Sequence, residues 1–76
     1  MKELLEVIAK ALVENPEDVH VSEIEGEQSI ILELRVAQED MGKVIGKQGR
    51  IAKAIRTVVK AAATRENKRV VVEILQ

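Results

Sequence analysis

The chain has 76 residues, which allows one small domain with a modest hydrophobic core. It contains no Phe, Tyr, Trp or Cys, so aromatic base stacking, disulfides, thiolate catalysis and sulfur-ligated metals are excluded. The net charge of −1 hides an asymmetry, because residues 1–40 hold three basic and eleven acidic residues whereas residues 41–69 hold nine basic and one acidic. This division predicts a basic face on a nearly neutral protein.

The first predicted element is an amphipathic helix over residues 2–14. Leu5, Ile8 and Leu12 recur at spacings of three and four, which places them on one face of a helix. The Asn-Pro pair that follows ends it, because proline disfavours helical backbone before it and cannot continue a helix. The segment lacks the pattern of a signal peptide, and no apolar run approaches about 18 residues, so we expect a cytoplasmic protein without a membrane span.

Two strands are predicted next, over residues 19–25 and 29–36, joined by a hairpin loop at 26–28. In the first strand apolar and polar residues alternate up to Ile24. Ile24 is apolar at a position where the alternation requires a polar residue, which indicates a bulge or the end of the strand. The second is apolar at every other position from Ile30 to Val36, which predicts a strand with one buried face.

The next stretch joins two helices through two glycines that are separated by two residues. Asp40 is expected to cap a short helix over residues 41–45. Gly46 follows this helix at a position where left-handed backbone is common, and Gly49 lets the chain turn directly into the next helix. The bare backbone between them lies beside a helix N-terminus, where amide groups and the helix dipole attract phosphate.

A longer helix is predicted from residue 50 to about 64, and a final strand from 69 to 75. One side of this helix is apolar and consists of Ile51, Ile55, Val58, Val59 and Ala62. Basic residues occupy a sector of about 120° on the other side. They are Arg50, Lys53, Arg56 and Lys60, and together with Lys47 they form a basic stripe that starts at the glycine hinge.

The order of elements is helix, strand, strand, helix, helix, strand. The hairpin makes the first two strands antiparallel, and the two-helix crossover lets the third strand lie parallel to the second. We therefore predict an α+β fold in a single domain spanning residues 1–76, with a three-stranded mixed sheet and three helices packed on one face.

The run Val44-Ile45-Gly46-Lys47-Gln48-Gly49, with Ile55 downstream, resembles the core of a KH domain, and the element order resembles the type II form. The chain length, the Asn-Pro stop and the lead-in at 39–42 are similar to those of the small bacterial KhpA group. This resemblance implies an RNA chaperone or post-transcriptional regulator that forms a homodimer and pairs with the larger KhpB (Jag) protein in cell-envelope regulation. Ala52 departs from the bulky aliphatic residue that many KH domains have there, which implies a shallower apolar floor.

The implied mechanism is a clamp on about four nucleotides of single-stranded RNA, with the glycine loop on the phosphates. Lys47, Arg50 and Lys53 would neutralise phosphate charge. The bases would lie on an aliphatic groove that is closed by the strand edge at 70–72. The RNA-binding residues implied in this way are Lys43, Val44, Ile45, Gly46, Lys47, Gln48, Gly49, Arg50, Ile51 and Lys53, of which Val44, Ile45 and Ile51 form the groove.

A protein-interaction domain, for which RNA binding is incidental, is the alternative function. Two apolar surfaces are candidates for a dimer seam. One is the sheet face away from the helices, with Ile31, Val71 and Leu75. The other is the C-terminal half of the long helix, residues 58–63, which the pattern favours because it is apolar nearly all round.

Other chemistries lack the residues that they need. A P-loop requires four residues between its glycines, whereas three separate Gly42 from Gly46. His20 is the only histidine and has no second nitrogen ligand to share a metal. Alternating acids at 23, 25 and 27 offer oxygen ligands for a divalent ion, but they are more typical of a sheet edge that resists aggregation. No nucleophile and base are paired, so we expect no enzymatic activity, metal site or cofactor.

Overall fold

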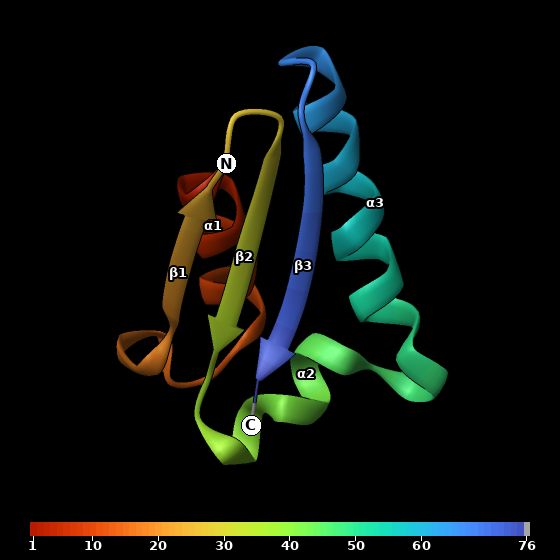
Figure 1. The fold of residues 1–76 in the computed structure, drawn as a ribbon. Coiled ribbons are helices and arrows are strands. Elements are labelled where there is room, and N and C mark those ends of the chain that lie inside the picture. The colour runs from red at the N-terminus through yellow and green to blue at the C-terminus, as the bar shows by residue number, and fades with distance from the viewer. Residues whose placement is uncertain (76) are drawn as a thin grey trace.

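The computed structural model describes residues 1–75, and within that range three α-helices and three β-strands form two layers (Figure 1). The helices are α1 (Lys2–Leu12), α2 (Met41–Ile45) and α3 (Arg50–Arg65), and the strands are β1 (His20–Glu25), β2 (Ser29–Arg35) and β3 (Arg69–Leu75). Single-turn 3₁₀ helices occupy three of the connections: η1 (Pro16–Asp18), η2 (Gln38–Asp40) and η3 (Lys47–Gly49). The predicted element order is confirmed. No helix in residues 1–75 is both long and apolar enough to cross a bilayer.

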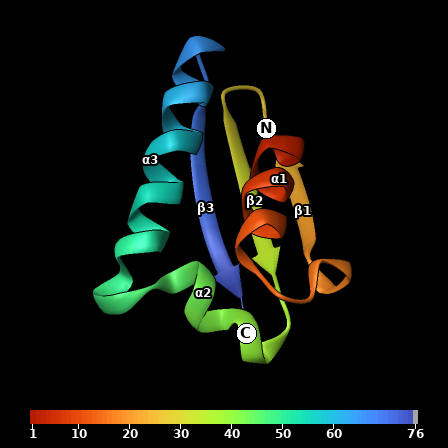
Figure 2. The ribbon, with the colours of Figure 1, turned by 180° about the vertical axis from the view of Figure 1, so that it is seen from behind.

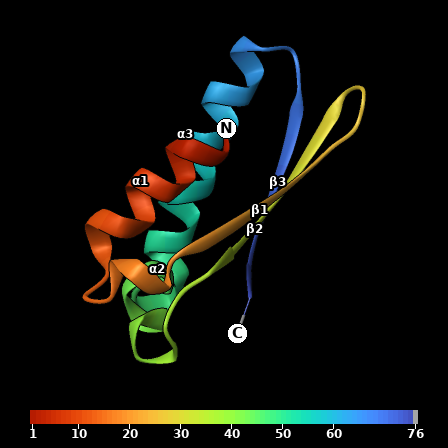
Figure 3. The same ribbon diagram turned by 90° about the vertical axis from the view of Figure 1, so that its left-hand side faces the viewer.

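The sheet has the strand order β1-β2-β3. Strand β1 is antiparallel to β2, with Val21 opposite Leu34, and β3 is parallel to β2, with Val72 opposite Leu32. All three helices lie on the same face of this sheet, as Figure 3 shows from the side. The mixed topology is therefore as predicted, and β3 has one edge without a strand partner among residues 1–75.

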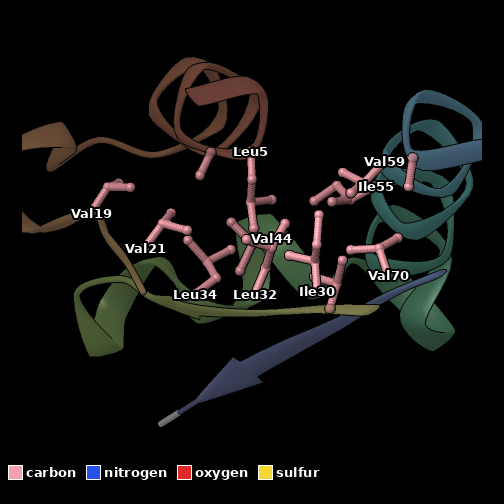
Figure 4. Close-up of a cluster of buried hydrophobic side chains, with 13 residues drawn as sticks. Leu5, Val19, Val21, Ile30, Leu32, Leu34, Val44, Ile55, Val59 and Val70 are labelled. Carbon is pink, nitrogen blue, oxygen red and sulfur yellow. The ribbon is translucent and has the colours of Figure 1, made fainter. Parts of the chain in front are cut away.

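The core lies between the helices and the inner face of the sheet (Figure 4). Aliphatic side chains from every helix and strand fill it, in keeping with the absence of aromatic residues. Ile30, Leu32 and Leu34 of β2 are buried in it, as the alternation predicted. The largest fully buried apolar side chains are Leu5, Ile30, Leu32, Leu34, Val44 and Val59, and each such burial contributes about 1.5–3 kcal/mol.

Two positions on the helices differ from the prediction. Leu12 is 37% exposed because α1 ends there, and Ala9 is the residue that packs into the core one turn earlier. Val58 is 49% exposed although its neighbour Val59 is fully buried. One residue turns an α-helix by about 100°, so only one of two adjacent valines can face the core.

Strand β1 contains no bulge within the described residues and keeps its register through Ile24, which lies directly opposite Ile31. Ile24 lies on the sheet face away from the helices and is 56% exposed. Because Ile31 is in turn opposite Val71, these three residues form an apolar row across the sheet. The change of parity at Ile24 reflects an apolar side chain on the open face. The predicted bulge is therefore wrong, whereas the alternative, the end of the strand, comes one residue later, at Glu25.

Candidate nucleic-acid interface

Asp40 does not cap α2, because its side chain makes no hydrogen bond to the first turn of that helix. The side chain is fully buried, and its carboxylate accepts hydrogen bonds from the chain that follows α1. The backbone amide of Glu14 donates to Oδ1 at 3.2 Å, and the backbone and side-chain amides of Asn15 both donate to Oδ2 at 3.0 Å. Asp40 therefore ties the end of the first helix to the start of α2, immediately before the hinge.

Lys43 lies at the same junction, with its ammonium 3.7 Å from Asp40 and 3.6 Å from Glu14. Burial acts to raise the pKa of Asp40, but the hydrogen bonds from Asn15 and Glu14, with the charge of Lys43, outweigh it. The pKa of Asp40 consequently lies below its ordinary value of 3.8. The structure thus places the Lys43 charge beside two carboxylates, apart from the cations at the hinge.

The hinge backbone has positive φ at three of four successive residues. Gly46 has φ 76° and ψ 173°, Gln48 has φ 57° and ψ 25°, and Gly49 has φ 74° and ψ 16°. The left-handed conformation costs an ordinary residue about 1–2 kcal/mol. The pair at 48–49 reverses the chain between α2 and α3, and Figure 2 shows the turn at the lower end of α3.

The two glycines of the hinge face different surroundings. A Cβ atom on Gly46 would lie 2.5 Å from Cγ1 of Ile51, well inside van der Waals contact. A Cβ atom on Gly49 would meet nothing within 4 Å among residues 1–75. Gly46 therefore leaves room for the Ile51 side chain, whereas Gly49 faces open space.

Exposed cations flank the open side of the hinge. Lys47, Arg50 and Lys53 are all exposed, and Arg50 Nη2 donates to Gln48 Oε1 at 3.2 Å, which holds the guanidinium beside the loop. The amide of Gly49 donates to the Gly46 carbonyl, and that of Arg50 donates to the Lys47 carbonyl. Part of the amide surface that was expected to meet phosphate is thus used inside the turn.

A groove of about 180 Å³ lies between α3 and the free edge of β3. Arg56 and Lys60 line it from the helix, and the strand contributes 70–72, the edge that the sequence predicted. Arg56 Nε donates to the Val72 carbonyl across the groove at 3.3 Å. The RNA-binding residues implied by the sequence ended at Lys53. Arg56 and Lys60 follow Lys53 by three and seven residues, so they lie on the same flank of the helix.

The aliphatic residues expected to form the groove are not equivalent. Val44 is fully buried in the core and presents no surface to a base, so this prediction is corrected. Its burial instead fixes α2 against the sheet, beneath the hinge. Ile45 and Ile51 are half-buried and pack against the core. Ala52 is buried on α3.

The family described as KhpA/KhpB, KH domain, matches residues 2–74. RNA-binding protein KhpA of Clostridium perfringens is 79% identical to this chain over 75 residues, which cover 99% of this chain and 100% of that protein. RNA-binding protein KhpA of Aquifex aeolicus is 53% identical, over 100% of this chain and 96% of that protein.

A solved structure also resembles this fold. It is described as the crystal structure of Era in complex with MgGDPNP and nucleotides 1506-1542 of 16S ribosomal RNA, and it aligns with a TM-score of 0.69 at 21% identity. The alignment covers 96% of this chain and 28% of the Era chain. The same arrangement of helices and strands therefore occurs as part of a longer protein.

We expect Gly46→Ala to destabilise the protein more than Gly49→Ala does. At position 49 alanine would adopt left-handed backbone, at a cost of about 1–2 kcal/mol. At position 46, with φ 76° and ψ 173°, it would enter a region that is essentially restricted to glycine, at a cost of about 1–3 kcal/mol, and only the methyl at this position meets Ile51. Overpacking of that kind adds about 1–3 kcal/mol. Urea unfolding followed by circular dichroism gives both free energies of unfolding, and equal losses would contradict the separate roles of the glycines.

Asp40→Asn should lower the free energy of unfolding near neutral pH, because an amide cannot replace both acceptor oxygens. The pKa of folded Asp40 lies below the ordinary 3.8, so the carboxylate stabilises the protein above that value and this contribution is lost as the pH falls through the folded pKa. The difference in melting temperature between wild type and variant should therefore shrink between about pH 6 and about pH 2.

Glu39→Gln is the matched control for Asp40→Asn, because Glu39 accepts an exposed hydrogen bond of 3.3 Å from the same Asn15 side chain. We expect this control to change the melting temperature little. A gap between wild type and Asp40→Asn that stays constant with pH would show that the buried carboxylate is not the stabilising group.

Proposed function

This chain belongs to the KhpA/KhpB KH-domain family, and we propose that it binds single-stranded RNA with its glycine hinge. The relatives in C. perfringens and A. aeolicus are both named RNA-binding proteins. The observation that carries the proposal is the open space in front of Gly49, flanked by the exposed cations Lys47 and Arg50. A sugar-phosphate backbone can approach the chain there without meeting a side chain.

Both the backbone and the side chains of the hinge contribute to phosphate binding. The amides of Lys47 and Gln48 face the phosphate as donors, since the next two amides are used within the turn. Lys47 adds a mobile point charge, whereas Arg50 offers a planar group that can form two hydrogen bonds to one phosphate. The bond from Arg50 to Gln48 orders the guanidinium in advance, which reduces the entropy that binding would cost.

The bases lie in the groove between α3 and β3. Ile45 and Ile51 supply aliphatic surface near the hinge, and the free edge of β3 offers amides and carbonyls to the base edges. In the free protein the Arg56 guanidinium donates a hydrogen bond to the Val72 carbonyl. A base that uses this carbonyl displaces the guanidinium, which then becomes available to a phosphate of the same strand.

Charge reversal at the hinge tests this function. The double substitution Lys47→Asp, Gln48→Asp should lower the affinity for an unstructured RNA by tenfold or more, about the value of one lost charge-assisted contact. Asp tolerates the left-handed backbone at position 48, so the fold should survive. Fluorescence anisotropy at several salt concentrations measures the effect, with a wild-type slope near −2 if about three phosphates are contacted.

Lys10→Asp, Gln38→Asp makes the same two replacements at exposed positions outside the groove and serves as the control. Circular dichroism establishes that each variant is folded. If the hinge variant folds and binds RNA as well as wild type does, the RNA clamp is wrong, and the protein-interaction module becomes the better account of the chain.

We also propose that the chain self-associates through α3. Ala54, Val58 and Ala61 are exposed at positions i, i+4 and i+7 of this helix, which forms an apolar seam on the flank away from the groove. Val58 is the largest of them and is 49% exposed. Val58 and Ala61 lie in the helix half, residues 58–63, that the sequence pattern favoured, whereas Ala54 precedes it.

Sedimentation velocity should therefore show wild type above the 8.4 kDa of a single chain and Val58→Glu at that mass. Ile24→Glu places the same charge in the apolar row of the open sheet face and is the control. A monomeric wild type at low and high salt, or a dimer disrupted only by Ile24→Glu, would rule out the helix seam.

The membership in this family extends the proposal to a cellular role. It supports an RNA chaperone or post-transcriptional regulator in the cytoplasm, with a KhpB-type protein as an alternative partner at the same seam in cell-envelope regulation. Retention of a KhpB-type protein by the immobilised wild type, but not by Val58→Glu, is the corresponding test.

A further inference from the structure

A second and larger hollow, of about 740 Å³, lies at the end of α3 that is distant from the hinge. We call it the distal hollow. The last turns of α3 line it with Lys60 and Thr64, the start of β2 with Gln28, and the turn before β3 with Asn67. At this end of the molecule the β1–β2 hairpin diverges from the helices (Figure 3).

The distal hollow adjoins the groove proposed to hold the bases. Lys60 and Val70 line both of them. Lys60 follows Arg50 by ten residues, a rise of about 15 Å along the helix. Four nucleotides at the stacked spacing of about 3.4 Å extend about 14 Å. A strand clamped at the hinge therefore reaches the distal hollow at about its fifth nucleotide.

The chemistry of the distal hollow suits a nucleotide. No acidic side chain of residues 1–75 lines it. Lys68, at its rim, forms an ion pair with Glu25, whereas Lys60 is exposed and has no ion pair within the described chain. The side-chain amides of Gln28 and Asn67 each offer donors and an acceptor, the combination that base edges require.

Resting on the proposed RNA-binding function, we propose that the distal hollow is a second RNA subsite, which takes one or two further nucleotides of the strand clamped at the hinge. Lys60 meets the phosphate between the two subsites, and the neutral amides meet the additional base. The binding site of one chain is then longer than the four nucleotides of the clamp.

The affinity ratio between a uridine heptamer and a uridine tetramer tests this proposal. A heptamer offers a four-nucleotide site in four registers, so a clamp alone predicts a ratio of about four. With a second subsite, we expect wild type to show a ratio of about twentyfold or more, which corresponds to one additional charge-assisted contact. Thr64→Glu should reduce this ratio to about fourfold and leave the affinity for the tetramer unchanged.

Thr57→Glu is the matched control. Both threonines are exposed on α3, and each hydroxyl donates to the carbonyl four residues earlier, at 3.0 Å for Thr57 and 2.9 Å for Thr64. Thr57 is closer to the hinge but lines neither hollow. If the added charge acted only at long range, Thr57→Glu would therefore weaken RNA binding at least as much.

The outcomes separate the two proposals. A wild-type ratio of about four, or an equal loss of the ratio in Thr57→Glu, overturns the distal subsite while the clamp at the hinge stands. Tetramer binding that is insensitive to the Lys47→Asp, Gln48→Asp substitution overturns the clamp, and the distal subsite with it. A large wild-type ratio that Thr64→Glu alone removes supports both.

Discussion

The contact between Ile51 and the bare Cα of Gly46 is the constraint on which the functional end of the molecule depends. It requires both a positive φ and the absence of a side chain at position 46, where α2 ends and the hinge begins. On the other side of α2, the buried carboxylate of Asp40 secures the start of the helix to the loop after α1. The hinge is thus fixed from both ends, and Gly49 can present open backbone on a rigid support. Preorganisation of this kind matters when the individual contacts with a ligand are weak.

Helix α3 separates two kinds of surface because each lies on its own flank. The flank beside β3 is basic and includes Arg56 and Lys60, whereas the opposite flank exposes small apolar residues around Val58. The buried stripe between them includes Val59 and holds the helix on the sheet. A net charge of −1 is therefore compatible with nucleic-acid binding. Five exposed basic residues lie at the hinge or on α3, namely Lys47, Arg50, Lys53, Arg56 and Lys60, while most acids lie in the first half of the chain. The same separation would allow the proposed RNA binding and the proposed self-association to use one helix without competition.

Local patterns predicted the elements well because each element follows one period. The alternation in β2 and the spacing of three and four in α3 depend on neighbours in sequence, so the strand and helix bounds agree within a few residues. The predictions failed where tertiary contacts determine the role of a residue. Asp40 has the sequence context of a helix cap, but its partners lie 25 and 26 residues away. In the same way, a Gly-x-x-Gly spacing does not reveal that one glycine faces Ile51 and the other faces open space.

The absence of aromatic residues explains why this fold would benefit from several shallow contacts. Without a ring to stack on, each base gains only aliphatic contact and edge hydrogen bonds, so a four-nucleotide clamp on one chain has little free energy of binding. A longer groove adds contacts on the same strand, and a dimer adds a second groove whose binding becomes intramolecular once the first is occupied. Both routes raise affinity without a larger core, which a chain of 76 residues cannot build. The lack of aromatic residues and the small size of the domain therefore both favour a long RNA site with many weak contacts.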